Sequence, residues 1–177
     1  MKRFTVFLLL VSPFFLFGQD VRMMRIKKAQ GTITLDGELN EADWLEADVA
    51  KDFQQTFPFD SSLALTGTEV MLTYDDDNLY VGAICHDPIE GKHVIQSLKR
   101  DFSFPVSDAF GIFIDPFDDG ANGFSFAVNP LGVQREGTLE NGGGFGVTTA
   151  WDNRWFSEVK IENGRWIVEM KIPFKSI

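Results

Sequence analysis

The segment at residues 151–155 holds the side chains best suited to binding a sugar. It reads Trp-Asp-Asn-Arg-Trp and follows a glycine-rich stretch at residues 142–144. A sugar site needs a flat aromatic face for the C–H side of the ring and a few charged or amide groups for the hydroxyls. We therefore name Trp151 as a candidate stacking platform and Arg154 as a candidate hydroxyl partner. The alternative is that Trp151 and Trp155 pack at the rim of the fold, because large aromatic side chains usually serve burial.

Acidic side chains are numerous but are not spaced for catalysis. Many of the 26 Asp and Glu residues stand in short runs, such as residues 75–77 and 118–119. Glycoside hydrolysis needs two carboxyl groups held across one bond at a defined separation. Acids in turns instead cap backbone N–H groups and face water. We therefore expect no catalytic residue in this chain.

Calcium is the metal that an acidic domain of this kind favours, because it takes hard oxygen ligands from turns. The candidate ligands are Asp115, Asp118 and Asp119. They fall at positions 1, 4 and 5, which is not the spacing of a helix–loop–helix calcium site, so solvated turns are the alternative. His86 and His93 lack cysteine partners for zinc.

Cys85 is the single cysteine and excludes a disulfide framework. Because it lies in an apolar stretch, we interpret it as a small buried core residue.

Alternating apolar and polar residues predict the strands that would position these groups. Residues 68–74 and 79–85 flank an acidic turn at 75–78 and form the clearest hairpin. A second hairpin joins residues 154–161 to 165–172 at Asn163-Gly164, the strongest short hairpin signal. The other expected elements are strands at 32–35, 110–115, 124–128 and 132–137, a helical turn at 38–45, and a brief helix or loop at 94–98.

These elements predict an all-β fold, an antiparallel β-sandwich, because strands recur with turn signals and no long amphipathic helix appears. The 18 Phe and four Trp residues supply its core. Residues 79–85 are apolar on both faces, so we expect an interior strand there. The sequence stops at Ile177, directly after a strand-ending Pro-Phe, and we expect the final strands of the domain to lie beyond it.

The first eighteen residues predict an export signal. Lys2 and Arg3 precede an apolar run at 4–17 that is too short to span a bilayer, and Gly18 precedes polar residues. A retained membrane anchor is the alternative. We divide the chain into a signal peptide at 1–18, a lead-in at 19–30 and a domain at 31–177, and expect it in the periplasm, outer membrane or cell surface of a Gram-negative bacterium. The net charge of −10 argues against a nucleic-acid partner.

Four short motifs occur in a characteristic order. They are Asp36-Gly37 followed by Trp44, Tyr74 to Tyr80, Phe113-Ile114-Asp115-Pro116, and Trp166 followed by Ile172-Pro173-Phe174. Over residues 25–177 they resemble the carbohydrate-binding module family 9 domain, as found at the amino terminus of large exported Bacteroidota proteins with a suspected outer-membrane barrel region. The resemblance implies a β-sandwich that, in its sugar-binding members, grips the end of a polysaccharide between two tryptophans. Such domains are commonly attached to xylanases.

The resemblance also implies where a sugar would bind. The first tryptophan of the site aligns at or beside Pro105, near Phe102 and Phe104, and the second would lie beyond Ile177. The acidic residue of the site aligns at Gly111 and its arginine at Ala127, just before the kept Val128-Asn129 pair. The resemblance therefore implies the fold, whereas the side chains that would contact sugar differ. The ligand-binding candidates are Phe104, Asp108, Asn129, Trp151 and Arg154.

We expect a non-catalytic, carbohydrate-binding-type module of a larger exported protein, associated with the binding and breakdown of a polysaccharide or oligosaccharide. One alternative is a structural or gating periplasmic domain of an outer-membrane barrel, without sugar affinity, that docks on the downstream region of the same polypeptide. A further alternative is the targeting module of an O-glycosyl hydrolase.

Overall fold

The computed structural model describes residues 22–87, 89, 92–141, 146–162 and 164–177. The predicted signal peptide, residues 19–21 of the lead-in, the three glycines at 142–144 and Asn163 lie outside the described residues. No helix in the part that is described is long and apolar enough to cross a membrane.

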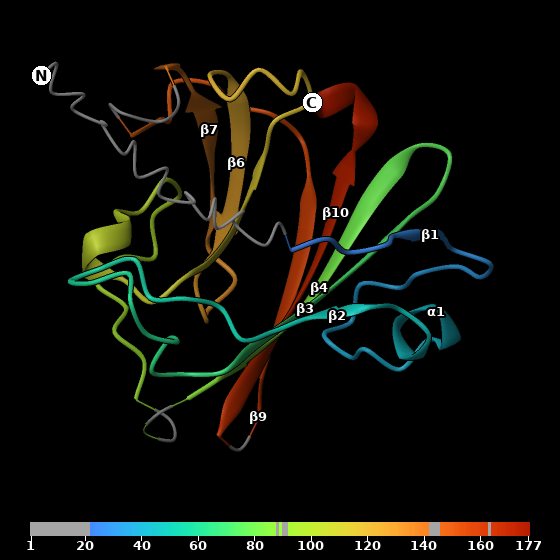
Figure 1. The fold of residues 1–177 in the computed structure, drawn as a ribbon, viewed down its shortest axis with the longest axis horizontal. Coiled ribbons are helices and arrows are strands. Elements are labelled where there is room, and N and C mark those ends of the chain that lie inside the picture. The colour runs from blue at the N-terminus through green and yellow to red at the C-terminus, as the bar shows by residue number, and fades with distance from the viewer. Residues whose placement is uncertain (1–21, 88, 90–91, 142–145, 163) are drawn as a thin grey trace, which may run out of the picture.

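Two β-sheets pack against each other (Figure 1). The larger has the strand order β1-β3-β4-β10-β9, with β2 also paired to β3, and the smaller has the order β5-β6-β7-β8. Among the described pairs, only β1 and β3 run parallel. The elements are β1 (Lys27–Lys28), α1 (Ala42–Leu45), β2 (Val49–Ala50), β3 (Thr68–Tyr74), β4 (Asn78–His86), η1 (Phe104–Val106), β5 (Phe110–Ile114), β6 (Gly123–Val128), β7 (Gln134–Leu139), β8 (Val147–Thr148), β9 (Phe156–Glu162), β10 (Arg165–Pro173) and η3 (Phe174–Ser176). The predicted all-β sandwich is confirmed.

The main core lies between the two sheets. Alternate residues of β4, β6 and β10 face it, as the two-residue period of a strand requires. The buried side chains are Leu79, Val81, Ala83, Cys85, Phe126, Val128, Trp155, Trp166, Val168, Met170 and Ile172. β4 pairs with β3 on one side and β10 on the other, so the predicted interior strand is confirmed.

The acidic turn between β3 and β4 is held by Asp75. Its Oδ1 accepts the backbone N–H groups of Asp77 and Asn78 at 2.8 and 2.7 Å, and its Oδ2 accepts the Tyr80 hydroxyl at 2.7 Å. Burial of Tyr80, together with this bond, raises the pKa of the phenol to about 12. The first predicted hairpin is therefore present, with its acid serving the turn.

A second, smaller core covers the other side of the large sheet. Trp44 of α1 is 2% exposed and packs with Ile33, Met71 and Tyr80. Beneath it, a side chain at Gly82 would meet a Leu39 methyl carbon at 2.7 Å, so Leu39 packs closely over this glycine and would have to shift. The helical turn expected at 38–45 is thus confirmed for residues 42–45, which form α1 and anchor the fold.

Buried Glu169 of β10 secures the neighbouring Asp36-Gly37 turn. Its Oε2 accepts the N–H groups of Asp36 and Gly37 at 2.9 and 2.7 Å. Burial raises the pKa of the Glu169 carboxyl, although these two bonds oppose the change.

One strand expected from the sequence is absent from the structure, and another is shorter than expected. Residues 32–35 form no strand, because Thr34 donates its N–H to the Glu41 carboxylate at 2.9 Å rather than to a neighbouring strand. Of the helix or loop expected at 94–98, the structure has the loop, in which Ile95 makes an isolated antiparallel bridge with Ser107. The strand expected at 132–137 begins at Gln134, since the turn before it is closed by Asn129.

Candidate functional site

The small sheet has an outer face that is turned away from the large sheet. Phe110, Ile112 and Ile114 of β5 pack on the main core, as do Phe124, Phe126 and Val128 of β6. Alternation along the strands sends the residues between them to the opposite face. The outer face is therefore formed by Gly111, Phe113, Gly123, Ser125, Ala127, Arg135, Gly137 and Leu139.

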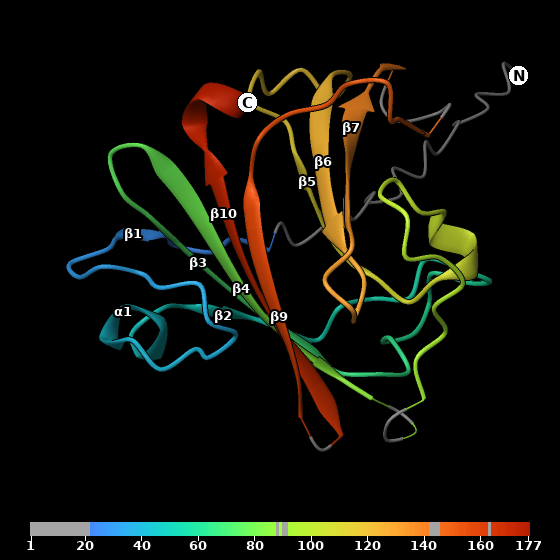
Figure 2. The same cartoon turned by 180° about the vertical axis from the view of Figure 1, so that it is seen from behind.

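Residues 97–107, which we name the strap, cross this outer face. Figures 1 and 2 show η1 on the far side of β6 and β7 from the large sheet. The Cζ of Phe104 lies 3.3 Å from the point where a side chain at Gly111 would begin, and the Ala127 Cβ lies equally close to that point. Gly111 and Ala127 are partners across β5 and β6, so together they form a small apolar seat for the Phe104 ring.

Arg135 covers the same ring from β7. It is the cross-strand partner of Ala127, and its guanidinium carbon lies 5.1 Å from the centroid of the Phe104 ring. Its Nη1 also donates to the Phe102 carbonyl at 3.2 Å. The Phe102 ring is 3% exposed and meets Phe104 edge-on, with centroids 5.8 Å apart. Phe104, which is partly buried, thus contacts a cation, an aromatic edge and the seat.

A buried carboxylate fastens the strap to the sandwich. Glu136 is 1% exposed and forms an ion pair with Arg100 of the strap, and it also accepts the Trp155 indole N–H at 3.2 Å. Arg100 donates to the Gln134 side chain at 2.8 Å, and the Asp101 N–H reaches the Gln134 carbonyl at 3.1 Å. Burial raises the pKa of Glu136, and the Arg100 guanidinium opposes that rise.

The opposite end of the outer face carries an exposed aromatic ring. Phe113 is 58% exposed and borders a shallow cavity of about 200 Å³. Asp115, Asn122 and Leu139 also line this cavity. An apolar ring beside carboxylate and amide groups is a combination that suits a sugar.

Comparison with known proteins identifies the family. Residues 35–177 match the family model described as carbohydrate family 9 binding domain-like. The chain belongs to this family. The resemblance drawn from the four motifs is therefore confirmed for the domain; the Bacteroidota setting stays a prediction.

Relatives of this family 9 domain include a xylanase and a sugar-bound module. Endo-1,4-beta-xylanase A of Thermotoga neapolitana is 31% identical over 157 residues, which is 83% of this chain but only 12% of the xylanase. Two structures of a family 9 module from Caldicellulosiruptor kristjanssonii share the fold. The complex with cellotriose has a TM-score of 0.54, 22% identity, and coverage of 84% of this chain and 66% of that one. The complex with glucose has a TM-score of 0.56 and 21% identity, and the match covers 85% of this chain and 69% of that one.

Trp151 and Phe104 lie on opposite sides of the small sheet in this family 9 domain. Trp151 is half-buried and packs on the core residues Phe124 and Phe126, with ring centroids 5.0 and 6.0 Å away. This position favours the alternative in which Trp151 and buried Trp155 serve packing. Arg154 is exposed and lies over the Phe156 ring at 5.3 Å. Trp151 therefore does not share a face of the small sheet with Phe104.

Asp108 and Asn129 hold the backbone at the base of the strap. Asp108 accepts the Val94 N–H through Oδ2 at 2.8 Å and donates its own N–H to the Val94 carbonyl at 2.7 Å. Asn129 is fully buried; its Oδ1 accepts the N–H groups of Leu131 and Val133, and its amide reaches the Ser97 carbonyl at 3.4 Å. Both side chains thus position the strap around the candidate site, and sugar contact by either stays a prediction.

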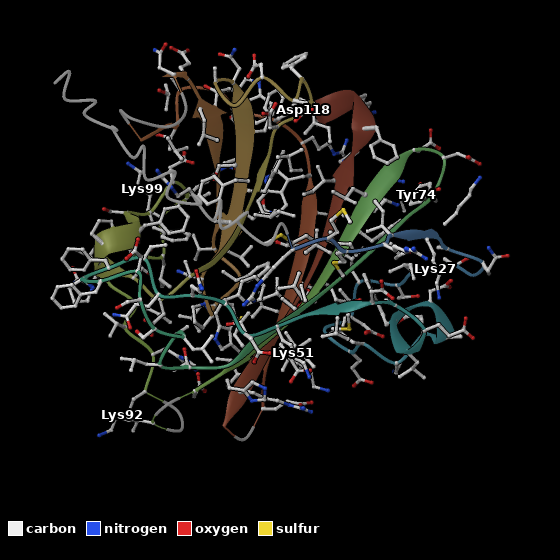
Figure 3. The ribbon with its side chains drawn as sticks, viewed as in Figure 1. Lys27, Lys51, Tyr74, Lys92, Lys99 and Asp118 are labelled. Atoms are coloured by element: carbon white, nitrogen blue, oxygen red, sulfur yellow. The ribbon has the colours of Figure 1, made fainter. Side chains whose placement is uncertain are left out.

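The candidate calcium ligands are used by the turn that contains them. Asp115 accepts the N–H groups of Phe117 and Gly120 at 3.1 and 2.8 Å. Asp119 accepts N–H groups of Asn122 and Ala121, which lower the pKa of its carboxyl. Asp118, labelled in Figure 3, lies in the same turn at one end of the small sheet. Across the described ranges, no three His, Cys, Asp or Glu side chains are grouped as a metal site.

The remaining reactive side chains are separate from the strap. Cys85 is 8% exposed and burial raises the pKa of its thiol to about 12, so its interpretation as a core residue is confirmed. His86 pairs with Glu69 at 3.2 Å, and His93 lies 3.5 Å from Asp87.

Arg100, Arg135 and Glu136 were not identified from the sequence. They bind partners that are distant along the chain, and no local motif marks them. The sequence signal that could have pointed to two of them is the adjacent charged pair Arg135-Glu136 inside the strand expected at 132–137.

Proposed function

We propose that this family 9 domain is a non-catalytic carbohydrate-binding module and that the outer face of its small sheet binds the sugar. Support comes from its family, from a xylanase relative, and from neighbours of the same fold that are in complex with cellotriose and glucose. The ligand class is accordingly an oligosaccharide or a polysaccharide.

One observation carries the choice of face. The resemblance placed site residues at or beside Pro105, at Gly111 and at Ala127, which are well separated in sequence. In the structure Phe104, the neighbour of Pro105, is in one cluster with Gly111 and Ala127. The arginine of the family's site aligns at Ala127. Arg135, the cross-strand partner of Ala127, supplies an arginine at the same place. The cluster therefore supplies an aromatic ring and a cation at one place.

The chemistry of this face suits a sugar ring. Phe113 offers apolar surface for the C–H side of the ring, and the guanidinium of Arg135 offers N–H donors for hydroxyl groups. Asn122 and Asp115 add a donor and an acceptor beside Phe113. No proton transfer or bond cleavage is assigned to any of these groups.

The chain spans 12% of the xylanase it matches, so the activity of the whole protein is a separate matter. We propose that the module, at residues 31–177, follows a signal peptide at 1–18 and serves an exported protein that acts on polysaccharide. A catalytic region of the glycoside hydrolase type is the partner that the relative suggests. Targeting would then raise the local concentration of that region on its substrate.

Titration of the folded chain with glucose, cellotriose and xylotriose, followed calorimetrically and by NMR, tests the function. We expect binding that weakens about tenfold in both Arg135→Ala and Phe113→Ala, since each removes one polar or stacking contact. Phe57→Ala is the matched control, because Phe57 is 84% exposed on the loop between β2 and β3. The absence of heat and of shift changes with every sugar, in a chain shown to be folded, would reject the proposal.

A second candidate function is favoured by the filled seat. Phe104 covers Gly111 and Ala127, which is what a structural or gating domain without sugar affinity would show. The same titration separates the two functions.

A further inference from the structure

We propose that Phe104 is a built-in plug, and that residues 103–106 of the strap must lift before a sugar reaches Gly111, Ala127 and Arg135. This inference rests on the proposed sugar-binding function and adds regulation to it. The occupied state is then one in which a sugar ring replaces the phenyl ring.

The seat has no room for both rings. The Phe104 Cζ and Cε1 lie 3.3 and 3.6 Å from the point where a Gly111 side chain would begin, so a single added carbon already meets the ring. The Arg135 guanidinium lies over Phe104. A sugar ring is at least as thick as a phenyl ring, so it enters only if Phe104 leaves.

The part of the strap that carries Phe104 is fastened only at its two ends. Residues 101 and 102 are bonded to Gln134 and Arg135, and Ser107 and Asp108 are bridged to Ile95 and Val94. Between them, η1 makes only its own turn bonds, from Val106 to Ser103 and from Ser107 to Phe104. Among the described residues, no hydrogen bond joins residues 103–106 to the sheet. Lifting this segment therefore breaks side-chain contacts alone.

Arg135 retains hydrogen-bonding capacity in the closed state. Its Nε is buried and has no hydrogen-bond partner among the described residues, while its Nη1 donates a hydrogen bond to the Phe102 carbonyl. A buried donor without an acceptor is unfavourable, and a sugar hydroxyl oxygen that reaches it would remove that penalty. This unpaired donor, beside a seat shaped for a ring, is what indicates a ligand at this place.

A plug lowers apparent affinity by the fraction of molecules that are open. Removing the Phe104 ring removes its cation–π and aromatic contacts, which hold the closed state. We therefore expect Phe104→Ala to bind cellotriose about tenfold more tightly than the wild-type chain. Phe104→Leu keeps apolar packing but loses the flat ring, and we expect a gain of about threefold.

The test titrates cellotriose into the wild-type chain and into Phe104→Ala, Phe104→Leu and the control Phe57→Ala. NMR supplies a second readout, because the Gly111 amide and the Ala127 methyl lie near the Phe104 ring and sense its ring current. On saturation, both wild-type signals should lose the ring-current shift that Phe104 gives them, as the plug leaves. Circular dichroism checks folding, and Phe104→Leu carries the test if Phe104→Ala does not fold.

The outcomes separate the two proposals. Tighter binding by the Phe104 variants, with Phe57→Ala unchanged, supports the plug. Equal or weaker binding by folded variants, while the wild-type chain binds, overturns the plug and leaves sugar binding intact. No binding of cellotriose, glucose or xylotriose by any folded variant or by the wild-type chain overturns both.

Discussion

The indole nitrogen of Trp155 donates a hydrogen bond to Glu136 across 3.2 Å, although both side chains are buried. The same carboxylate pairs with Arg100 of the strap. One buried acid thus joins the aromatic core to the segment that covers the outer face.

Replacing Glu136 should reveal how much this junction contributes. Glu136→Leu leaves the Trp155 N–H without its acceptor and Arg100 without its carboxylate, and should lower the free energy of unfolding by about 2–3 kcal/mol. Glu136→Gln keeps an acceptor oxygen and should cost about 1 kcal/mol or less. Urea unfolding measures both, and equal values for the two variants would contradict the assignment.

Glu169 should make stability depend on pH. Burial raises its pKa above 4.5, so its contribution is fully present below the unfolded pKa near 4.5 and is lost as pH rises through the raised folded pKa. Glutamine does not ionise in this range, so the Glu169→Gln variant lacks this pH-dependent contribution to the free energy of unfolding. The wild-type chain should therefore gain stability relative to the variant as pH falls toward 4.5. Urea unfolding across that range checks it, and a constant difference between the two proteins would refute it.

Gly37 should tolerate no side chain. Its φ is +79°, and a Cβ would meet the Lys160 Cβ at 2.7 Å, so Gly37→Ala should cost about 2–4 kcal/mol from backbone strain and the clash together. Gly120→Ala is the matched control, with φ of +63° and nothing within 4 Å, and should cost about 1–2 kcal/mol from strain alone. Thermal unfolding compares them; similar losses would mean that the Lys160 contact relaxes freely.

Trp151 should matter for stability rather than for sugar binding. Because it packs on Phe124 and Phe126 and is half-buried, Trp151→Ala should lower the free energy of unfolding by about 2–3 kcal/mol. Retention on polysaccharide gels should equal that of the wild-type chain. A stable variant with lost retention would restore Trp151 as the stacking platform.

Local patterns were enough to predict much of the fold. The two-residue alternation at 68–74 and 79–85 became β3 and β4, since one face of each strand is buried in the main core. The expectation at 32–35 failed because a side chain, Glu41, took the N–H that a strand would have used. A local apolar pattern could not reveal that competition.

The site was harder to predict than the fold. Phe104 was recognised as a candidate, but its partner Arg135 lies 31 residues further on and meets it only because β6 and β7 pair. Glu136 reads in the sequence as one surface acid among many, although it is 1% exposed. Burial of a charge depends on tertiary partners, and spacing along the chain does not encode them.

The tie between Arg100 and Glu136 has an evolutionary consequence. Arg100 meets none of the residues of the seat, yet it helps to hold the strap that covers them. If residues 103–106 lift as proposed, a substitution at this distant position would change how often the face is uncovered without altering any group proposed to touch a ligand. Homologous proteins could thus change their affinity for different glycans through the Arg100–Glu136 ion pair alone, while the contact surface stays unchanged.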